Sequence, residues 1–346
     1  MKILIISTQI SGHGGIPRFT RNIIDQLKSR QDTSVKIVSL NDYEKEYNGA
    51  GRNKLIFVLR VIRTIWTMRP DHIVCNHLHM VPLSIFKFFS PSSFWHVVIH
   101  GREAWPLRKR LKPFYSNIDR FWAVSSYTKK TFAMSNTVAL EKIKIVLLTT
   151  PDFWEASSAQ LNYAPFFLSV ARLEKDIYKG VDTTIEAIHK HEVAMRGFGY
   201  KYIIVGSGDD LQRHVDLVNN FKLNDIISFK SQISDTELKE LYRTTSCSIL
   251  PSQREGFGLV FLEAMAFKKA VIGCKNCGSE DVIEHGRTGY LIAPEVDDIW
   301  KHMRLFMEQP KLFKQMGEAG YLKREKEFKG EKTQENIEEL LSISRH

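Results

Sequence analysis

Short apolar runs alternate with amphipathic segments along almost the whole chain, and this alternation limits the possible folds more than any other feature of the sequence. Strands are expected in the first half at residues 2–7, 35–40, 72–75, 97–100, 121–124 and 143–147. Helices are expected between them at residues 17–29, 53–68, 107–115 and 127–133. Strands that alternate with helices in this way form a parallel sheet with helices on both faces. The first half of the sequence therefore predicts a doubly wound α/β domain.

The same alternation restarts after a stretch at residues 149–164 that has no clear period. Six further strands are expected at residues 166–170, 202–205, 226–229, 247–250, 270–273 and 290–292. A chain of 346 residues also exceeds the size at which one hydrophobic core usually stops growing. We therefore expect two Rossmann-like domains, at residues 1–157 and 158–327, whose strand ends face each other across an interdomain cleft.

Positive charge is concentrated in the first domain. Residues 1–150 contain 23 lysines and arginines against 9 aspartates and glutamates, and the remainder contains 26 against 30. The densest part, residues 105–114, interleaves bases with aromatic and apolar side chains, as surfaces that touch anionic lipid do. A solvated helix face would show a similar pattern, and nucleic acid is a third alternative, for which no binding motif is present. Peripheral contact with an anionic membrane is therefore one expectation from the charge pattern.

Neither a membrane span nor a secretory signal is expected. The most apolar long stretch, residues 81–99, is interrupted by Lys87, Pro91 and four serines, and residues 2–7 suit a buried strand better than a signal sequence. Four cysteines, two of them inside apolar strands, fit reduced and buried thiols. The spacing of Cys274 and Cys277 does not define a zinc site by itself, and no metal-ligand cluster is evident. The expected location is the cytoplasm, including the inner face of the membrane.

A glycine turn between two glutamates stands out in the second half of the chain. The apolar strand at residues 247–250 is followed by Glu255, Gly256 and Gly258, and then by a run of helix formers that contains Glu263. The start of a helix offers unpaired backbone N–H groups and the positive end of the helix dipole. This stretch is therefore expected to bind an anion such as a phosphate.

Two cations follow an earlier strand of the same domain. Arg172 comes directly after the strand at residues 166–170, and Lys179 precedes the next helix. A planar guanidinium and a mobile ammonium that converge at one strand end suit a diphosphate, although two surface cations would have the same pattern. Gly206 and Gly208 form a tight turn after the following strand, which is a weak signal when taken alone.

In the first domain, candidate ligand-binding residues follow two strands. Gly14 and Gly15 lie in the turn after the first strand, and Pro17 suits the first position of the next helix. A dinucleotide fingerprint would have a glycine in place of Pro17, so this match fails. His100 ends another strand. A single histidine there is more often structural, but this one lies at the end of the sheet where ligands bind.

Together these motifs resemble those of the family 4 retaining glycosyltransferases, which have the two-domain GT-B fold. The resemblance covers nearly the whole chain, up to Pro294, and its most specific part is the Glu-x7-Glu element from Glu255 to Glu263. The other matching residues are Gly14, Gly15, His100, Gly101, residues 123–125, Arg172, Lys179, Gly180 and residues 206–208, 250–252 and 286–291. The resemblance implies that the last helix, residues 328–346, packs back on the first domain.

The resemblance also implies roles for the site residues. Arg172 and Lys179 would hold the diphosphate of a nucleotide sugar in the second domain. Glu255 would hold the sugar and Glu263 the ribose, and His100 would contact the transferred sugar. The expected catalytic residues are Glu255, His100, Arg172 and Lys179. The expected donor-binding residues are Gly15, Gly206, Gly208, Gly256, Phe257, Gly258, Leu259, Val260 and Glu263. Ile16, Arg102 and Glu103, next to Gly15, would border the acceptor in the first domain.

The reaction implied by the resemblance is transfer of a sugar, with retention at the anomeric carbon, to a saccharide or lipid-linked saccharide in polysaccharide or glycan biosynthesis. A UDP-sugar is the expected donor, and neither a cofactor nor a metal is expected. An epimerase or phosphorylase of the same fold remains an alternative, which a donor-only assay would separate. A nicotinamide-dependent dehydrogenase is disfavoured by Pro17. A non-enzymatic protein that binds sugar nucleotides is disfavoured by the intact set of Glu255, Glu263, Arg172 and Lys179.

Overall fold

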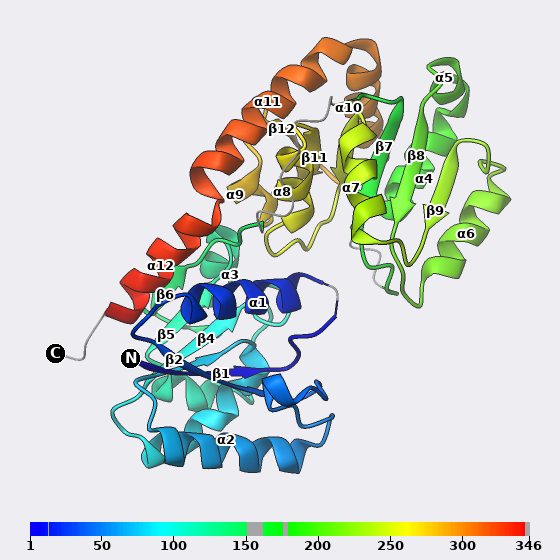
Figure 1. The fold of residues 1–346 in the computed structure, drawn as a ribbon. Helices are drawn as coiled ribbons and strands as arrows, with labels where there is room; N and C mark the ends of the chain where they lie inside the picture. The colour runs from blue at the N-terminus through cyan, green and yellow to red at the C-terminus, as the bar shows by residue number, and fades with distance from the viewer. Residues whose placement is uncertain (13, 151–161, 176–178, 343–346) are drawn as a thin grey trace. The chain divides into compact units, whose positions relative to one another are not determined.

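The chain divides into two compact α/β units. The structure is a computed structural model, and it describes residues 1–12, 14–150, 162–175 and 179–342. Unit 1 comprises Met1–Pro151 together with Gly330–His346, and unit 2 comprises Asp152–Lys329. The boundary expected between residues 157 and 158 lies outside the described residues. Each unit has its own sheet and its own buried core (Figure 1).

Unit 1 is built on a parallel sheet of six strands in the order β2-β1-β3-β4-β5-β6. The strands are β1 (Lys2–Ser7), β2 (Ser34–Ser39), β3 (His72–Cys75), β4 (Phe94–Ile99), β5 (Arg120–Ala123) and β6 (Ile143–Ile145). Neighbouring strands pair in parallel, for example Ile3 with Val35 and with His72. The direction of the strand order reverses between β1 and β3, and in open α/β sheets ligands bind outside the carboxyl ends of strands at such a switch point.

Helices cover both faces of this sheet, with α1 on one face and α2 on the other (Figure 1). The α-helices of unit 1 are α1 (Gly15–Lys28), α2 (Lys54–Met68), α3 (Ser126–Asn136) and α12 (Gly330–Ser342). Short 3₁₀ segments are η1 (Lys45–Tyr47), η2 (Leu78–Phe89), η3 (Lys112–Asn117) and η4 (Leu140–Lys142). The C-terminal helix α12 packs against α1, and an ion pair joins Arg30 to Glu338 with 3.8 Å between nitrogen and oxygen. The chain thus returns to its first unit at its end.

Two local predictions in unit 1 are wrong. The helix expected at residues 107–115 is absent, and η3 begins only at Lys112. Pro113 has no N–H to donate to the carbonyl of Lys109, so a helix through these residues would lose a backbone hydrogen bond. The second error concerns Pro17, which is the third residue of α1 and not the first, because the helix already begins at Gly15. The first turn of a helix tolerates proline because its N–H groups have no partner within the helix.

Unit 2 is built on a second parallel sheet, in the order β12-β11-β10-β7-β8-β9. Its strands are β7 (Phe166–Val170), β8 (Lys201–Val205), β9 (Ile227–Lys230), β10 (Cys247–Leu250), β11 (Ala270–Cys274) and β12 (Gly289–Ile292). The strand order reverses between β7 and β10, which makes their carboxyl ends the switch point of this sheet. The predicted α/β fold with two doubly wound parallel sheets is confirmed.

The helices of unit 2 follow the predicted alternation. They are α4 (Val181–Lys190), α5 (Glu192–Gly197), α6 (Leu211–Asn220), α7 (Asp235–Thr244), α8 (Leu259–Ala266), α9 (Ser279–Val282), α10 (Val296–Glu308) and α11 (Pro310–Glu327). At the start of α7, Ser234 accepts from the N–H of Glu237, whose side chain accepts from the N–H of Ser234. The helix α10 packs on α4, and α11 packs on α8 and β11. These contacts hold the helices that carry the candidate residues against the sheet.

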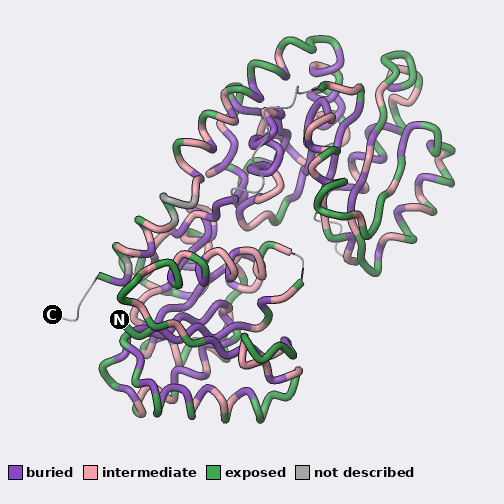
Figure 2. Tube along the Cα trace, viewed as in Figure 1, coloured by how far each residue is buried: buried purple, intermediate pink, exposed green. Residues whose placement is uncertain are grey.

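The sheet residues form the core of each unit, and Figure 2 shows most strand residues as buried. All four cysteines are buried and carry no disulfide, which agrees with the expectation of reduced and buried thiols. Burial raises the pKa of the Cys75 and Cys247 thiols far above their ordinary range, so these side chains stay protonated and unreactive. In the part of the chain that the structure describes, no helix has both the length and the apolar character needed to cross a membrane.

Candidate functional site

The switch point of unit 2 carries an ion pair between two of the expected catalytic residues. Lys179 precedes α4, and Glu255 lies in the loop between β10 and α8. The Lys179 Nζ is 3.0 Å from Glu255 Oε2, and the two side chains are only 20% and 16% exposed. A partly buried ion pair loses its stabilisation when one partner is removed, because a charge is then left uncompensated. The site can therefore present one positive and one negative group side by side.

The backbone around Gly180 explains why these two loops meet. Gly180 has a φ of +73°, and a Cβ at this position would lie 2.3 Å from the carbonyl oxygen of Pro251. Only glycine accepts both this left-handed conformation and this close approach. The residue next to Lys179 thus packs directly on the loop that leads to Glu255, and the ion pair follows from that contact.

Arg172 is placed differently from Lys179. Its guanidinium is exposed and forms an ion pair with Glu174, at 3.0 Å between Arg172 Nη1 and Glu174 Oε1. Arg172 therefore pairs with Glu174, whereas Lys179 pairs with Glu255. A hollow of about 500 Å³ is lined by Lys175, Gly208, Asp209 and Glu174, the ion-pair partner of Arg172. This hollow lies at the ends of β7 and β8, on the same edge of the sheet as Lys179.

Gly206 and Gly208 support the loop that carries Arg172. A Cβ at Gly206 would lie 1.9 Å from the carbonyl oxygen of Ala171, and one at Gly208 would lie 1.9 Å from that of Leu173. The N–H of Leu173 also donates to the carbonyl of Ser207 at 3.0 Å. Close packing of the loop after β7 on the turn after β8 therefore explains why glycine is needed at both positions, without reference to any ligand.

The loop between β10 and α8 leaves Glu255 partly exposed, and Glu263 in α8 is buried. Glu263 is the fifth residue of α8 and is 2% exposed, and its Oε2 accepts a hydrogen bond of 2.9 Å from the hydroxyl of Tyr242. The Phe257 ring is buried edge-on against Phe328, with 5.9 Å between ring centroids, so this residue can offer a ligand only its backbone. Leu259 and Val260 are half-buried at the start of α8, where the N–H groups of the first turn point outward.

Behind the switch point, a charged network joins the starts of α4 and α6. Asp182, in the first turn of α4, lies 3.2 Å from His214 Nε2 and accepts from Arg213 at 2.5 Å. Arg213 also binds Asp210, whose backbone carbonyl is 2.8 Å from His214 Nδ1. Burial disfavours the charged forms, but the hydrogen bond between the two groups raises the pKa of His214 and, with Arg213, lowers that of Asp182. Sequence analysis missed this network because its members are up to 32 residues apart.

In unit 1, a buried aspartate fixes the glycine loop after β1. Asp42 accepts from the N–H groups of Ile10 and Ser11, at 2.7 and 3.0 Å, and from the hydroxyls of Ser11 and Ser39. Burial raises the pKa of Asp42, but these hydrogen bonds lower it by more, so the carboxylate remains ionised. Arg21 of α1 donates to the carbonyls of Ile10 and Gly12. The predicted site residues Gly15 and Ile16 follow this loop as the first two residues of α1.

The carboxyl ends of the neighbouring strands β3 and β4 carry two histidines that are held neutral. His100 follows β4, and its Nε2 lies 2.9 Å from the carbonyl oxygen of Asn76, while its ring meets Phe19 edge-on. Burial lowers the pKa of His100, against the effects of Glu103 and Asn76. His77 follows β3, and burial together with His100 lowers its pKa to about 4. Sequence analysis missed His77, although its place just after a buried strand could have indicated it.

The hydrogen bonds of these histidines define what each ring can offer. A carbonyl oxygen only accepts, so the Nε2 of His100 carries the proton and its Nδ1 is an acceptor. The Nδ1 of His77 accepts from the N–H of His79 at 3.2 Å, so its Nε2 carries the proton. Two neutral rings, with 6.4 Å between their centroids, thus offer one donor and one acceptor. A hydroxyl group, which both donates and accepts, matches this pair.

The two predicted acceptor residues after His100 lie in one turn. The Glu103 Oε1 accepts from the backbone N–H of His100 at 2.5 Å, and the Glu103 carbonyl accepts from Arg108 Nε at 2.7 Å. Arg102 is exposed beside them. Glu103 therefore fixes the turn and the backbone of His100, and Arg102 presents its charge at the surface.

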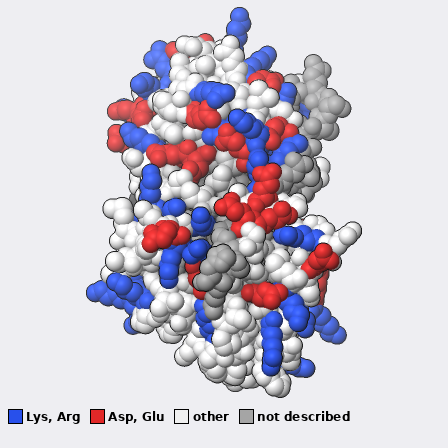
Figure 3. Space-filling view, turned by 90° about the vertical axis from the view of Figure 1, so that its left-hand side faces the viewer, with Lys and Arg blue, Asp and Glu red and all other residues white. Residues whose placement is uncertain are grey.

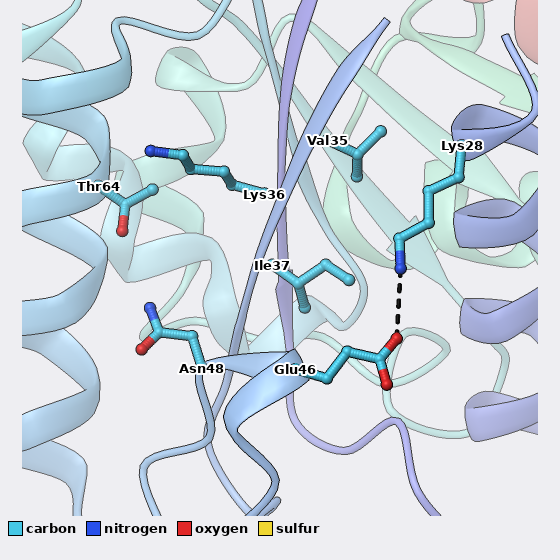
Figure 4. A pocket seen from close by; sticks show the side chains of 7 residues that line it. All are labelled: Lys28, Val35, Lys36, Ile37, Glu46, Asn48 and Thr64. Atoms are coloured by element: carbon cyan, nitrogen blue, oxygen red, sulfur yellow. Dashed lines mark hydrogen bonds and ion pairs between the residues drawn. The ribbon is translucent and has the colours of Figure 1, made fainter.

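A groove of about 250 Å³ elsewhere in unit 1 contains none of the predicted residues. It runs along the edge strand β2 and is lined by Lys28, Val35, Lys36, Ile37, Glu46, Asn48 and Thr64 (Figure 4). Lys28 and Glu46 form an ion pair across it, with 3.3 Å between nitrogen and oxygen. In open α/β sheets ligands bind at the carboxyl ends of strands, so we do not assign this groove to the site. Among the described residues, no group of three His, Cys, Asp or Glu side chains is arranged to hold a metal ion.

Comparisons with known proteins identify a common family. The family model described as "Glycosyl transferases group 1" matches residues 152–323. The chain is 33% identical to an N-acetyl-alpha-D-glucosaminyl L-malate synthase of Bacillus anthracis over 135 residues, which are 38% of this chain and 34% of that protein. An uncharacterized glycosyltransferase of Methanocaldococcus jannaschii is 24% identical over 92% of both chains. The crystal structure of Anabaena HepE in complex with UDP is similar with a TM-score of 0.80 and 18% identity, over 99% of this chain and 100% of that one.

These comparisons confirm the two-domain GT-B fold that the sequence resemblance implies. The match to each of five curated relatives covers only 32% to 41% of the length of that relative. The family model lies within unit 2 and covers Arg172, Lys179, Glu255 and Glu263. The candidate residues of unit 2 are thus part of the shared region.

Proposed function

Because the chain belongs to the group 1 glycosyltransferase family, we propose that it transfers a sugar from a nucleoside diphosphate sugar to a saccharide or lipid-linked saccharide in glycan biosynthesis. UDP is the proposed nucleotide, and the similarity to a structure that binds UDP supports this choice. Retention at the anomeric carbon and catalysis without a metal ion are parts of the same proposal.

The ion pair between Lys179 and Glu255 is the observation that carries the proposal. When the bond to the sugar breaks, negative charge develops on the leaving diphosphate, and a fixed cation beside it lowers the barrier. Lys179 would supply that cation. Glu255 lies 3.0 Å from the same nitrogen, so it would lie next to the sugar that is attached to the phosphate, where a carboxylate accepts hydrogen bonds from hydroxyl groups.

Other residues near the carboxyl ends of the strands of unit 2 would make the remaining contacts with the nucleotide sugar. Arg172 would exchange Glu174 for a phosphate oxygen, since both partners are anionic and the guanidinium is exposed. Glu263 would hold the ribose hydroxyls, and Tyr242 would fix the position of its carboxylate. The backbone of Gly256, Phe257 and Gly258, and the first N–H groups of α8, would complete the anion site.

The proposed acceptor site lies at the strand ends of unit 1. His100, for which the resemblance implies contact with the transferred sugar, would together with His77 also bind a hydroxyl of the acceptor as a matched donor and acceptor, and Ile16, Arg102 and Glu103 would border it. A neutral site suits a saccharide hydroxyl, because burying an uncompensated charge beside it would cost free energy. The protein would act in the cytoplasm, as a peripheral protein on the membrane that holds a lipid-linked acceptor.

The test is a product assay with the purified protein, a panel of UDP-sugars and GDP-sugars, and saccharide acceptors with and without a lipid anchor. We expect a UDP-sugar to be consumed only with an acceptor, unaffected by EDTA, to give a product whose anomeric configuration by NMR equals that of the donor. Consumption of the donor without acceptor would favour the epimerase. An inverted product would refute retention.

A further inference from the structure

The helix α2 of unit 1 has an apolar side that faces away from the sheet. Its buried side, formed by Phe57, Val61 and Ile65 among others, packs on β1 and β2. On the other side, Leu55, Leu59 and Trp66 are 69%, 57% and 64% exposed. With Ile62, which is half-buried, these residues follow a spacing of 4, 3 and 4 along the sequence. At about 100° per residue, all four fall within an arc of about 60° on the helix.

This outward stripe, Leu55, Leu59, Ile62 and Trp66, is unusual for a surface helix. Surface helices normally carry polar residues opposite their buried side, and a helix that is apolar on both sides is normally covered on both. The neighbouring segment η2, which packs beside α2, exposes Ile85 and Phe88 as well. Buried and exposed residues alternate along α2 in Figure 2, and the exposed ones include these large apolar side chains. Contiguous exposed apolar surface of this kind marks an interaction site.

All of the charged residues in the segment that carries the outward stripe, residues 51–70, are positive. Residues 51–70 contain Arg52, Lys54, Arg60, Arg63 and Arg69 but no aspartate or glutamate. Among the described residues, only Arg60 of these five has its side chain in a hydrogen bond, which it donates to the carbonyl of Gly49, and none is in an ion pair. In Figure 3 the lowest part of unit 1 is largely uncharged, with lysines, arginines and a few acidic side chains beside and above it.

We propose that the outward stripe of α2 docks unit 1 on a bilayer that contains anionic phospholipid. Leucine and tryptophan side chains would enter the boundary between head groups and acyl chains, while the arginines and Lys54 stay at the level of the phosphates. A second copy of this chain fits the surface less well, because two such helices side by side would bring like charges together without a counter-charge. The inference deepens the proposed peripheral location and rests on that part of the proposed function, but not on sugar transfer.

The structure also distinguishes this surface from the basic segment at residues 105–114, which the sequence suggested for the same role. There, Leu111 and Phe114 pack against the core of unit 1, and the Trp105 ring meets Tyr127 edge-on. Only Leu107 among its large apolar side chains is exposed. That segment therefore offers charge without an apolar surface, whereas α2 offers both.

The experiment is co-sedimentation of the full chain with vesicles of phosphatidylcholine alone or with added phosphatidylglycerol, in the absence of any nucleotide sugar. The test variant combines Leu55→Gln, Leu59→Gln and Trp66→Gln. The matched control combines Met134→Gln, Val193→Gln and Leu322→Gln, whose side chains are 84%, 81% and 65% exposed on other helices. Because all six residues are exposed, both variants should fold, which circular dichroism and thermal melting check.

We expect the wild type and the control to bind vesicles with phosphatidylglycerol, and the stripe variant to bind them at least about tenfold more weakly. Binding should also weaken with added salt and with phosphatidylcholine alone. The proposal is overturned if the wild type does not sediment with the anionic vesicles, or if the stripe variant binds as tightly as the control. It is also overturned if the wild type is a dimer in solution that the stripe variant converts to monomers. Unchanged UDP binding by the stripe variant would show that the donor site is intact.

Discussion

At the strand ends of unit 2, ionised side chains pair with one another, whereas at those of unit 1 imidazole rings are held neutral. In unit 2, Lys179 pairs with Glu255, and Asp182 pairs with His214, whose pKa is raised. In unit 1, burial lowers the pKa of His77 to about 4 and also lowers that of His100. Both sheets are parallel and six-stranded, so the difference in charge comes from the residues that follow the carboxyl ends of their strands.

This contrast corresponds to two kinds of ligand. A diphosphate carries charge and can replace Glu255 or Glu174 as the partner of a cation, which keeps the charge balanced. A saccharide hydroxyl is neutral and gains most from a donor and an acceptor that are both uncharged. The comparison therefore predicts that changes in unit 2 affect the donor and that changes in unit 1 affect the acceptor.

Replacement of Lys179 by alanine should have the largest effect. It removes the cation from the proposed leaving group and leaves Glu255 without its partner, so kcat/KM should fall by about 10²- to 10³-fold. The measurement is the initial rate of transfer from the UDP-sugar. Lys190→Ala is the control, because Lys190 forms an exposed ion pair with Asp297 at 2.6 Å, and its rate should be unchanged. Equal rates for both variants would end the assignment of the phosphate site.

Gly180→Ala should have the next largest effect, which is a loss of folding stability. The added methyl group would collide with the carbonyl of Pro251 in a left-handed backbone, which should cost about 2–4 kcal/mol of unfolding free energy. The control is Gly199→Ala, which has a similar φ of +67° but no neighbour within 4 Å of a Cβ, and should cost only about 1 kcal/mol. Urea denaturation measures both. A similar loss in the two variants would mean that backbone strain alone, and not the contact with Pro251, explains the glycine.

His214 of unit 2 should contribute to stability with the opposite pH dependence to the buried histidines of unit 1. His72, His77 and His96 have lowered pKa values in the fold, so unit 1 loses stability as the pH falls below the ordinary histidine pKa of about 6.5. His214 has a raised pKa, so its contribution to unit 2 is complete below about 6.5 and is lost as the pH rises through the raised value. Hydrogen exchange at several pH values, corrected for the intrinsic rate, measures each unit separately. His96→Gln should weaken the acid sensitivity of unit 1 alone.

His77→Phe should have the smallest effect and should be confined to the acceptor. It removes the proposed N–H donor, so the KM for the acceptor should rise by about tenfold while the KM for the donor stays the same. His189→Phe is the control, because His189 stacks on Phe221 at the surface of unit 2, with 3.9 Å between ring centroids. A rise in the donor KM with His77→Phe would contradict the assignment of the acceptor to unit 1 and the donor to unit 2.

The local pattern of the sequence predicts the strands and most helices. It fails at residues 107–115, where Pro113 and the packing of Leu111 and Phe114 override the helical pattern. It also predicts that Lys179 and Glu255 serve the same site, because each follows a strand of the same sheet.

The partners of these residues were not predictable in the same way. Asp42 with the loop after β1, Tyr242 with Glu263, and Asp182 with His214 are joined by hydrogen bonds across 21 to 32 residues. Such contacts depend on the order of strands in the sheet, which the local pattern does not contain. The pairing of His77 with His100 likewise becomes visible only when β3 and β4 are known to be neighbours.

Calorimetric titration with UDP tests the central claim most directly. The account predicts that the wild type and the His77→Phe variant bind UDP with the same affinity, and that Lys179→Ala weakens binding by at least about tenfold. Stronger loss with His77→Phe than with Lys179→Ala would contradict the assignment of the diphosphate to the charged strand ends of unit 2.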